Sequence, residues 1–224
     1  MVFKLDRPKA KQELLHSAVN LGVVLVSMIY IHNIKDLKNI GKFWDSLVIP
    51  FIFVGEILKL TLAHYYAMDS RAVNAQQQKT NFKCKNSFSA ANIILAIFIQ
   101  CAVVVFYGFS CILLGAPVLQ DYEQTCVLSI ILTLLTVSPL VFLLGAGGTL
   151  QEVYIQLYKY HAIGAILGAW IGSVVVPLDW DQDWQEYPIP NVIGALCGSG
   201  ISTIINTSST LHKIAVAVTQ KKSS

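Results

Sequence analysis

Apolar residues along this chain come in runs of about 15 to 25, separated by short polar clusters. A run of about 20 apolar residues forms a helix that crosses roughly 30 Å of hydrocarbon. The pattern therefore predicts an all-α fold, a polytopic membrane helix bundle with about six transmembrane helices. The expected spans are 14–31, 46–68, 89–114, 125–145, 161–176 and 188–205.

Composition favours lipid over water as the solvent of this chain. Apolar residues make up 54% of the sequence and charged residues 13%, and the mean hydropathy is +0.59, values that exclude an ordinary water-soluble domain. We expect one transmembrane domain over 1–218, a tail over 219–224, and no nucleic-acid partner. The end of the sixth span is open, because 206–213 is polar and 214–218 is apolar again, so one long tilted helix could continue there.

The distribution of positive charge predicts the orientation. Twelve of the 16 Lys and Arg residues fall before the first span, after the second, between the fourth and fifth, or after the sixth. Only Lys35, Lys38 and Lys42 fall on the other side, and Lys59 lies within a span. Because positive residues are retained in the cytoplasm, both termini are expected to be cytoplasmic.

The chain ends in Lys221-Lys222-Ser223-Ser224. Lysines at the fourth and third places from the carboxyl end have the form of a dilysine retrieval signal, which is read in the cytoplasm and predicts a multi-pass protein of the endoplasmic reticulum membrane. The alternative is a lysine pair that anchors a helix end among lipid headgroups.

Small residues recur at four-residue spacing in the last two spans. Such stripes let helix backbones approach closely in lipid, so the two spans are expected to pack tightly together or against a partner. Glycine is also simply frequent in membrane helices. The candidate packing residues are Gly164, Gly168, Gly172, Gly194, Gly198 and Ser202.

Glu56 and Lys59 lie one helical turn apart near the middle of the second span. A charge at this depth costs roughly 3 kcal/mol on insertion scales, so each needs a partner. Glutamate before lysine on one helix face is a favourable order, which predicts an ion pair. A lipid headgroup site or a proton site remains an alternative.

The segment 177–190, between the last two spans, has prolines at both ends, interfacial aromatic residues and four acidic groups. Four acidic groups are one possible site for a divalent ion, but their spacing is not that of a recognised metal loop. The chain contains no nucleophile elbow, zinc-protease pair or aspartate array. No catalytic, metal or cofactor residue is therefore expected. The five cysteines lack paired spacing and are expected to be small buried apolar residues.

The carboxy-terminal third resembles the PIG-F family. The resemblance is carried by Gly168-Ala169-Trp170-Ile171-Gly172 and by Gly194-Ala195 with Gly198, around a signature loop. Gly115-Ala116-Pro117 agrees more weakly, while Tyr187 and Asp183 stand where tryptophan and proline are usual. The signature loop residues, expected to be luminal, are Pro177, Leu178, Asp179, Trp180, Trp184, Gln185 and Pro188.

The resemblance implies a non-catalytic subunit of glycosylphosphatidylinositol (GPI) biosynthesis. It would bind and stabilise the GPI ethanolamine phosphate transferases, PIG-O-like and PIG-G-like, which transfer ethanolamine phosphate to mannose of the GPI precursor. A lipid-handling protein that uses Glu56 and Lys59 for phosphatidylethanolamine or the GPI precursor is the alternative. A lipid phosphotransferase is a third and weaker one.

Overall fold

The computed structural model describes residues 7–33, 37–75, 90–117, 122–138, 141, 149–178 and 180–223. Within these ranges all regular structure is helical, which confirms the all-α prediction. Two short 3-10 helices, η1 (Leu37–Gly41) and η3 (Asp183–Gln185), lie between α-helices. The six α-helices are α1 (Arg7–Asn33), α2 (Val48–Ala75), α3 (Ala90–Leu113), α4 (Tyr122–Thr136), α6 (Thr149–Ser173) and α7 (Ile189–Ser223).

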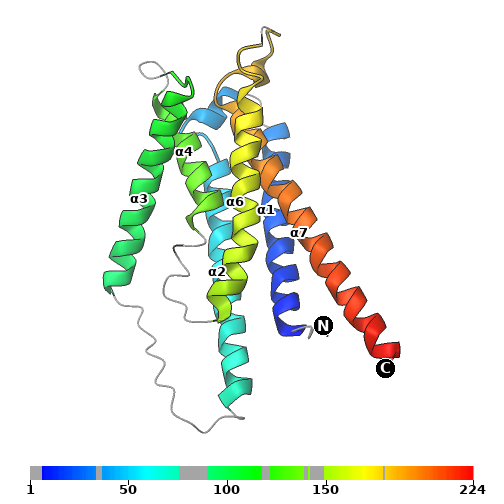
Figure 1. The fold of residues 1–224 in the computed structure, drawn as a ribbon. Coiled ribbons are helices and arrows are strands. Elements are labelled where there is room, and N and C mark those ends of the chain that lie inside the picture. The colour runs from blue at the N-terminus through cyan, green and yellow to red at the C-terminus, as the bar shows by residue number, and fades with distance from the viewer. Residues whose placement is uncertain are drawn as a thin grey trace.

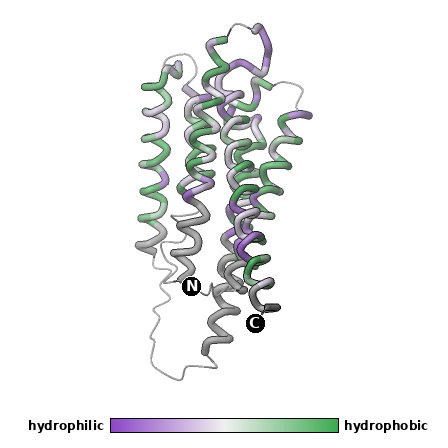
Figure 2. The backbone as a smooth tube through the Cα atoms, turned by 45° about the vertical axis from the view of Figure 1, so that its right-hand side comes forward, coloured by the Kyte–Doolittle hydropathy of each residue, from purple (hydrophilic) through white to green (hydrophobic). Residues whose placement is uncertain are grey.

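The helices run alternately up and down in one bundle (Figure 1). One end, here called the loop end, carries η1 and the hydrophilic loop before α7 (Figures 1 and 2). At the opposite terminal end, α1 begins and α7 ends (Figure 1). Both ends of the described chain thus lie on one side, while the compartment that this side faces stays a prediction.

Three helical segments are long and apolar enough to cross a membrane: Glu13–Asn33, Ile94–Leu113 and Ile189–Thr219. The apolar part of α4, Tyr122–Thr136, is shorter. Only described residues contribute to these segments, so six crossings stay a prediction. Of the predicted span 125–145, residues 139, 140 and 142–145 lie outside the described ranges.

Two helix bounds differ clearly from the hydropathy pattern. Helix α6 begins at Thr149 rather than at residue 161, because the preceding polar turns contain helix formers such as Leu150, Gln151 and Glu152. Helix α7 is one continuous 35-residue helix, about 52 Å long, which agrees with the alternative of one long helix that continues past residue 205.

The polar positions of α7 stay helical because their hydroxyl groups find partners on the helix itself or on α1. Thr203 and Thr207 each donate a hydrogen bond to the carbonyl oxygen four residues earlier, at 2.7 and 2.8 Å. The Thr210 hydroxyl lies 2.9 Å from Glu13 Oε2 of α1 and 3.1 Å from the Asn206 carbonyl oxygen. In lipid, where water offers no alternative partner, this local bonding lets a polar sequence continue a helix.

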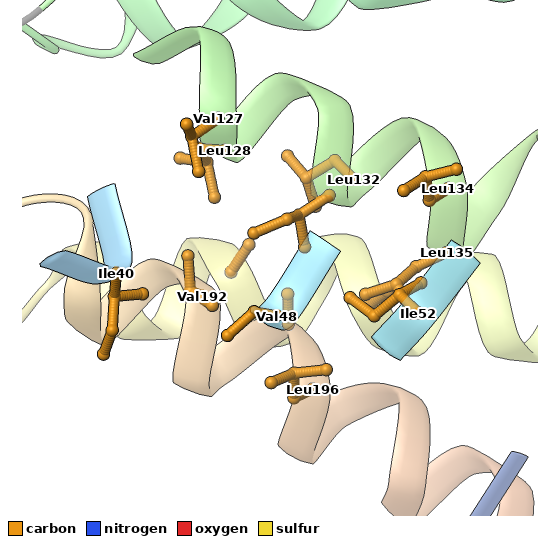
Figure 3. Packing of buried hydrophobic residues seen from close by; sticks show 14 of the residues in the cluster. Ile40, Val48, Ile52, Val127, Leu128, Leu132, Leu134, Leu135, Val192 and Leu196 are labelled. Carbon is orange, nitrogen blue, oxygen red and sulfur yellow. The ribbon is translucent and has the colours of Figure 1, made fainter. Parts of the chain in front are cut away.

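The apolar core lies toward the loop end, where α4 packs between α3 and the other helices. Figure 3 shows that α4, α2 and α7 all contribute to it. Outside this core, α3 packs chiefly on α4 and presents an apolar surface along most of its length (Figure 2). The core residues labelled in Figure 3 are Ile40, Val48, Ile52, Val127, Leu128, Leu132, Leu134, Leu135, Val192 and Leu196.

Candidate functional site

The small residues of α6 and α7 face each other along a line here called the glycine seam. A methyl group at Gly168 would lie 2.0 Å from the carbonyl oxygen of Gly194, and one at Gly198 would lie 2.0 Å from that of Gly164. At the two ends of the seam, Gly172 meets the Pro190 carbonyl oxygen and Gly164 meets the hydroxyl of Ser202. The seam is therefore filled by the chain's own backbone.

The loop between α6 and α7, residues 177–188, is here called the cap loop, and it is held by side-chain hydrogen bonds. Buried Gln185 accepts from the backbone N–H of Trp180 at 3.2 Å and donates to the carbonyl oxygen of Val175 at 2.8 Å. The hydroxyl of Tyr187 donates to Thr125 of α4 at 3.1 Å. These bonds connect the loop to the turn that follows α6 and to α4, so its shape is set by the bundle.

The signature residues divide between the inside and the outside of the cap loop. Gln185 and Pro188 are buried, whereas Pro177 and Leu178 are exposed. Trp180 and Trp184 are also exposed, with ring centroids 5.9 Å apart. Asp179 lies outside the described residues. The cap loop therefore presents an aromatic pair on a hydrogen-bonded support.

Glu56 and Lys59 form an ion pair inside the bundle. Their residues are 2% and 4% exposed, and the Lys59 ammonium donates to Glu56 Oε1. A second Lys59 hydrogen bond reaches Asn20 Oδ1 of α1 at 3.0 Å. Among the described residues, no donor reaches Glu56 Oε2. Helices α1 and α2 approach closely beside this pair, because a methyl group at Gly55 would lie 2.2 Å from Val23.

Asn20 extends the network to two more helices. Its Nδ2 donates to Thr203 Oγ1 of α7 at 2.7 Å and to Ser199 Oγ at 3.3 Å. Thr203 Oγ1 in turn lies 3.0 Å from His161 Nδ1 of α6, and the rings of His161 and His16 are 6.2 Å apart. We call these residues the polar cluster: His16, Asn20, Glu56, Lys59, His161, Ser199 and Thr203.

The polar cluster lies at one depth in the bundle. At 1.5 Å per residue, counted from the loop end, Lys59 is about 17 Å along α2, His161 about 18 Å along α6, Asn20 about 20 Å along α1 and Thr203 about 21 Å along α7. In a hydrocarbon layer of about 30 Å that began at the loop-end termini of these helices, this depth would lie just beyond the middle. Ionisable groups at such a depth are costly and mark functional or structural centres.

Sequence patterns indicated the charge pair but missed the rest of the cluster. His16, Asn20, His161 and Thr203 are single polar residues near or within apolar runs, and the available signal was that His16 and Asn20 lie four residues apart on one helix face. Among the described residues, no group of three or more His, Cys, Asp or Glu is placed to hold a metal ion.

Comparison with known families gives a match to the family model "GPI biosynthesis protein family Pig-F" over residues 9–207. The chain belongs to the Pig-F family. The glycine seam, the cap loop and the polar cluster all fall within the Pig-F match, whereas Lys221 and Lys222 lie beyond it. The backbone of these two lysines is in the last turn of α7, and their retrieval role stays a prediction.

Three Pig-F relatives illustrate the similarity. Glycosylphosphatidylinositol anchor biosynthesis protein 11 of Debaryomyces hansenii is 30% identical over 161 residues, which are 66% of each chain. The protein of the same name from Candida glabrata is 36% identical over 117 residues, 52% of this chain and 50% of that one. A PIGF/3-ketodihydrosphingosine reductase fusion protein of Schizosaccharomyces pombe is 34% identical over 106 residues, 44% of this chain and 22% of that one.

The matched part of this Pig-F chain thus spans 66% or less of the length of these three relatives. No solved structure matches the chain.

Proposed function

We propose that this chain acts in GPI-anchor biosynthesis as a non-catalytic subunit in the endoplasmic reticulum membrane. In this role it binds and stabilises GPI ethanolamine phosphate transferases, PIG-O-like and PIG-G-like, and the partner transfers ethanolamine phosphate to mannose of the GPI precursor. Membership in the Pig-F family supports the pathway, and so does the printed name of the relatives.

The observation that carries the docking part of the proposal is the exposure of Trp180 and Trp184 on a cap loop that the bundle holds in place. Aromatic side chains on a fixed support lose little conformational freedom on binding and are typical anchors of interfaces. The glycine seam is less suited to a partner, because α6 and α7 already fill it.

The direct test is affinity purification of the full chain from a gentle detergent. The variant Trp180→Ala with Trp184→Ala is expected to recover about fivefold less transferase, the effect of losing an interface anchor. Trp44→Ala is the matched control, because Trp44 is an exposed indole at the same end of the bundle but lies outside the cap loop. Equal recovery by all three proteins would exclude docking through the aromatic pair.

The proposed orientation places the cap loop in the lumen and both termini in the cytoplasm, with 1–218 as one transmembrane domain and 219–224 as its tail. The excess of Lys and Arg on the side of the termini supports it. A single cysteine at Ser223, in a chain without other cysteines, should react with an impermeant thiol reagent in sealed microsomes. Protection until the vesicles are opened would reverse the orientation.

A lipid-handling role remains the alternative of a different class. It would use Glu56 and Lys59 for a zwitterionic headgroup, yet both groups are buried and bonded to each other, so the helices would have to separate first. Purified chain in defined phosphatidylethanolamine vesicles distinguishes the two roles. If the purified chain binds or flips lipid, and Lys59→Met abolishes this activity, the lipid-handling role is favoured over the subunit role.

A further inference from the structure

The hydrogen bonds of the polar cluster form a chain in which each donor and acceptor is determined by the group before it. Lys59 is the first donor of this chain. An ammonium group has donors and no acceptor, so Lys59 can bond only the oxygen end of the Asn20 amide, and it does so at 3.0 Å. The nitrogen end of that amide is then turned toward α7. A cation on α2 thus selects which end of an α1 side chain faces the next helix.

The groups of α7 that face Asn20 accept hydrogen bonds, as the nitrogen end of its amide requires. Asn20 Nδ2 donates to the hydroxyl oxygen of Thr203 at 2.7 Å and to that of Ser199 at 3.3 Å. The Thr203 hydroxyl proton goes to the Ser199 carbonyl oxygen at 2.7 Å, which leaves Thr203 Oγ1 as an acceptor. By this count of protons, His161 Nδ1 is a donor to the same oxygen at 3.0 Å.

The opposite amide orientation would break the network. It would point the Asn20 NH₂ group at the Lys59 ammonium, where no lone pair is available, and the Asn20 oxygen at Thr203, whose hydroxyl would have to leave the Ser199 carbonyl oxygen in order to donate to it. Water could repair such a mismatch at a surface, but the cluster lies in the interior of a membrane bundle. A neutral residue in place of Lys59 would remove the constraint that selects one orientation.

We propose that Lys59 is an orienting charge inside the membrane: it fixes the amide of Asn20 and thereby sets how the α1–α2 pair docks on the α6–α7 pair. Glu56 holds the ammonium in place from one turn away on the same helix. Lys59 and Asn20 are positioning residues in this scheme, and the role needs no partner protein, so it stands independently of the transferase proposal.

A plainer explanation is that Glu56 and Lys59 only neutralise each other. The two explanations differ in what happens when both charges are removed together. If the two residues only neutralise each other, Glu56→Leu with Lys59→Met should leave the docking of α1 on α7 unchanged, because no unpaired charge remains. The orienting role makes the same double substitution impair that docking, since Asn20 loses the cation that selects its orientation.

Disulfide crosslinking of the full chain in membranes measures the docking directly. In a background with the five native cysteines replaced by serine, the reporter pair is Val24→Cys with Gly200→Cys. It reports on α1 and α7, because a methyl group at Gly200 would lie 3.3 Å from Val24 Cγ1. The control pair, Gly108→Cys with Ser129→Cys, joins α3 to α4, where the corresponding distance is 3.4 Å.

The expected result is a fall of about threefold or more in the crosslink between positions 24 and 200, both for Glu56→Leu with Lys59→Met and for Asn20→Leu. The control crosslink should not change in either variant. Lys59→Arg, which keeps a cation with donors only, should retain the reporter crosslink to a greater extent than the double substitution.

Three outcomes would overturn the proposal. An unchanged reporter crosslink in the double variant would leave mutual neutralisation as the whole role of Lys59. A parallel loss of the reporter and control crosslinks would make Lys59 a general folding residue. A loss with Lys59→Arg as large as that with the double substitution would show that the donor-only cation is not the property that matters.

Discussion

The α6–α7 pair and the α1–α2 pair are both helix pairs of one membrane bundle, but different forces stabilise them. Along α6 and α7, Gly168, Gly194 and Gly198 bring backbone against backbone. Beside the close contact at Gly55, α1 and α2 are joined by the hydrogen bond from the Lys59 ammonium to the Asn20 amide, and Lys59 is paired with Glu56 on α2 itself. The packing of α6 on α7 depends on close backbone contact, whereas the packing of α1 on α2 also involves a buried charged side chain.

This difference follows from the solvent. Lipid tails are as apolar as leucine, so burying apolar surface between two membrane helices gains little, and close packing or hydrogen bonds must supply the association energy. The glycine seam uses the first solution and the polar cluster the second. The seam should therefore be sensitive to any added volume, whereas the cluster should be sensitive to the loss of either charged partner.

The largest expected effect is the loss of one member of the buried ion pair. Lys59→Met leaves the Glu56 carboxylate buried without its cation, which costs about 3–5 kcal/mol of stability. Equilibrium unfolding in mixed micelles measures the change. The matched control is Lys42→Met, which breaks the exposed pair with Asp45 and should cost no more than about 1 kcal/mol. Equal losses would mean that burial is not what makes Lys59 sensitive.

The second effect tests the glycine seam by adding one carbon atom. Gly168→Ala puts a methyl group 2.0 Å from a backbone oxygen, which cannot move without shifting α7, so a loss of about 1–3 kcal/mol is expected in the same unfolding measurement. Gly22→Ala is the control, because nothing lies within 4 Å of that position. It should be neutral or slightly stabilising. A neutral Gly168→Ala would contradict the close backbone contact.

The smallest effect concerns one neutral hydrogen bond of the polar cluster. Thr203→Val keeps the side-chain shape but removes the hydroxyl shared by Asn20 and His161, which should cost about 0.6 kcal/mol, the usual value between membrane helices. Thr219→Val, which removes an exposed hydroxyl bonded only within α7, should cost less. A larger loss for Thr203→Val than for Lys59→Met would invert the proposed order of charge over neutral bonds.

Sequence patterns predicted the helical class and the glycine stripes because both depend on spacing within one segment. They gave the fifth span only from residue 161, whereas α6 already begins at Thr149, because its first turns mix polar and apolar residues and hydropathy does not register helix propensity. They also missed Asn20 and His161, because the role of a single polar residue in an apolar run cannot be recognised before its neighbours in space are known.

The sequence by itself determined that this chain is rich in long apolar helices, which face of α6 and of α7 carries the small residues, and that Glu56 and Lys59 lie one turn apart within an apolar run. Each of these follows from the order of residues along one helix. Only the tertiary structure decided that Gly168 and Gly194 fill each other's space and that Lys59 reaches Thr203 through Asn20. The choice of neighbour depends on how all the helices pack at once, and no single helix carries that information.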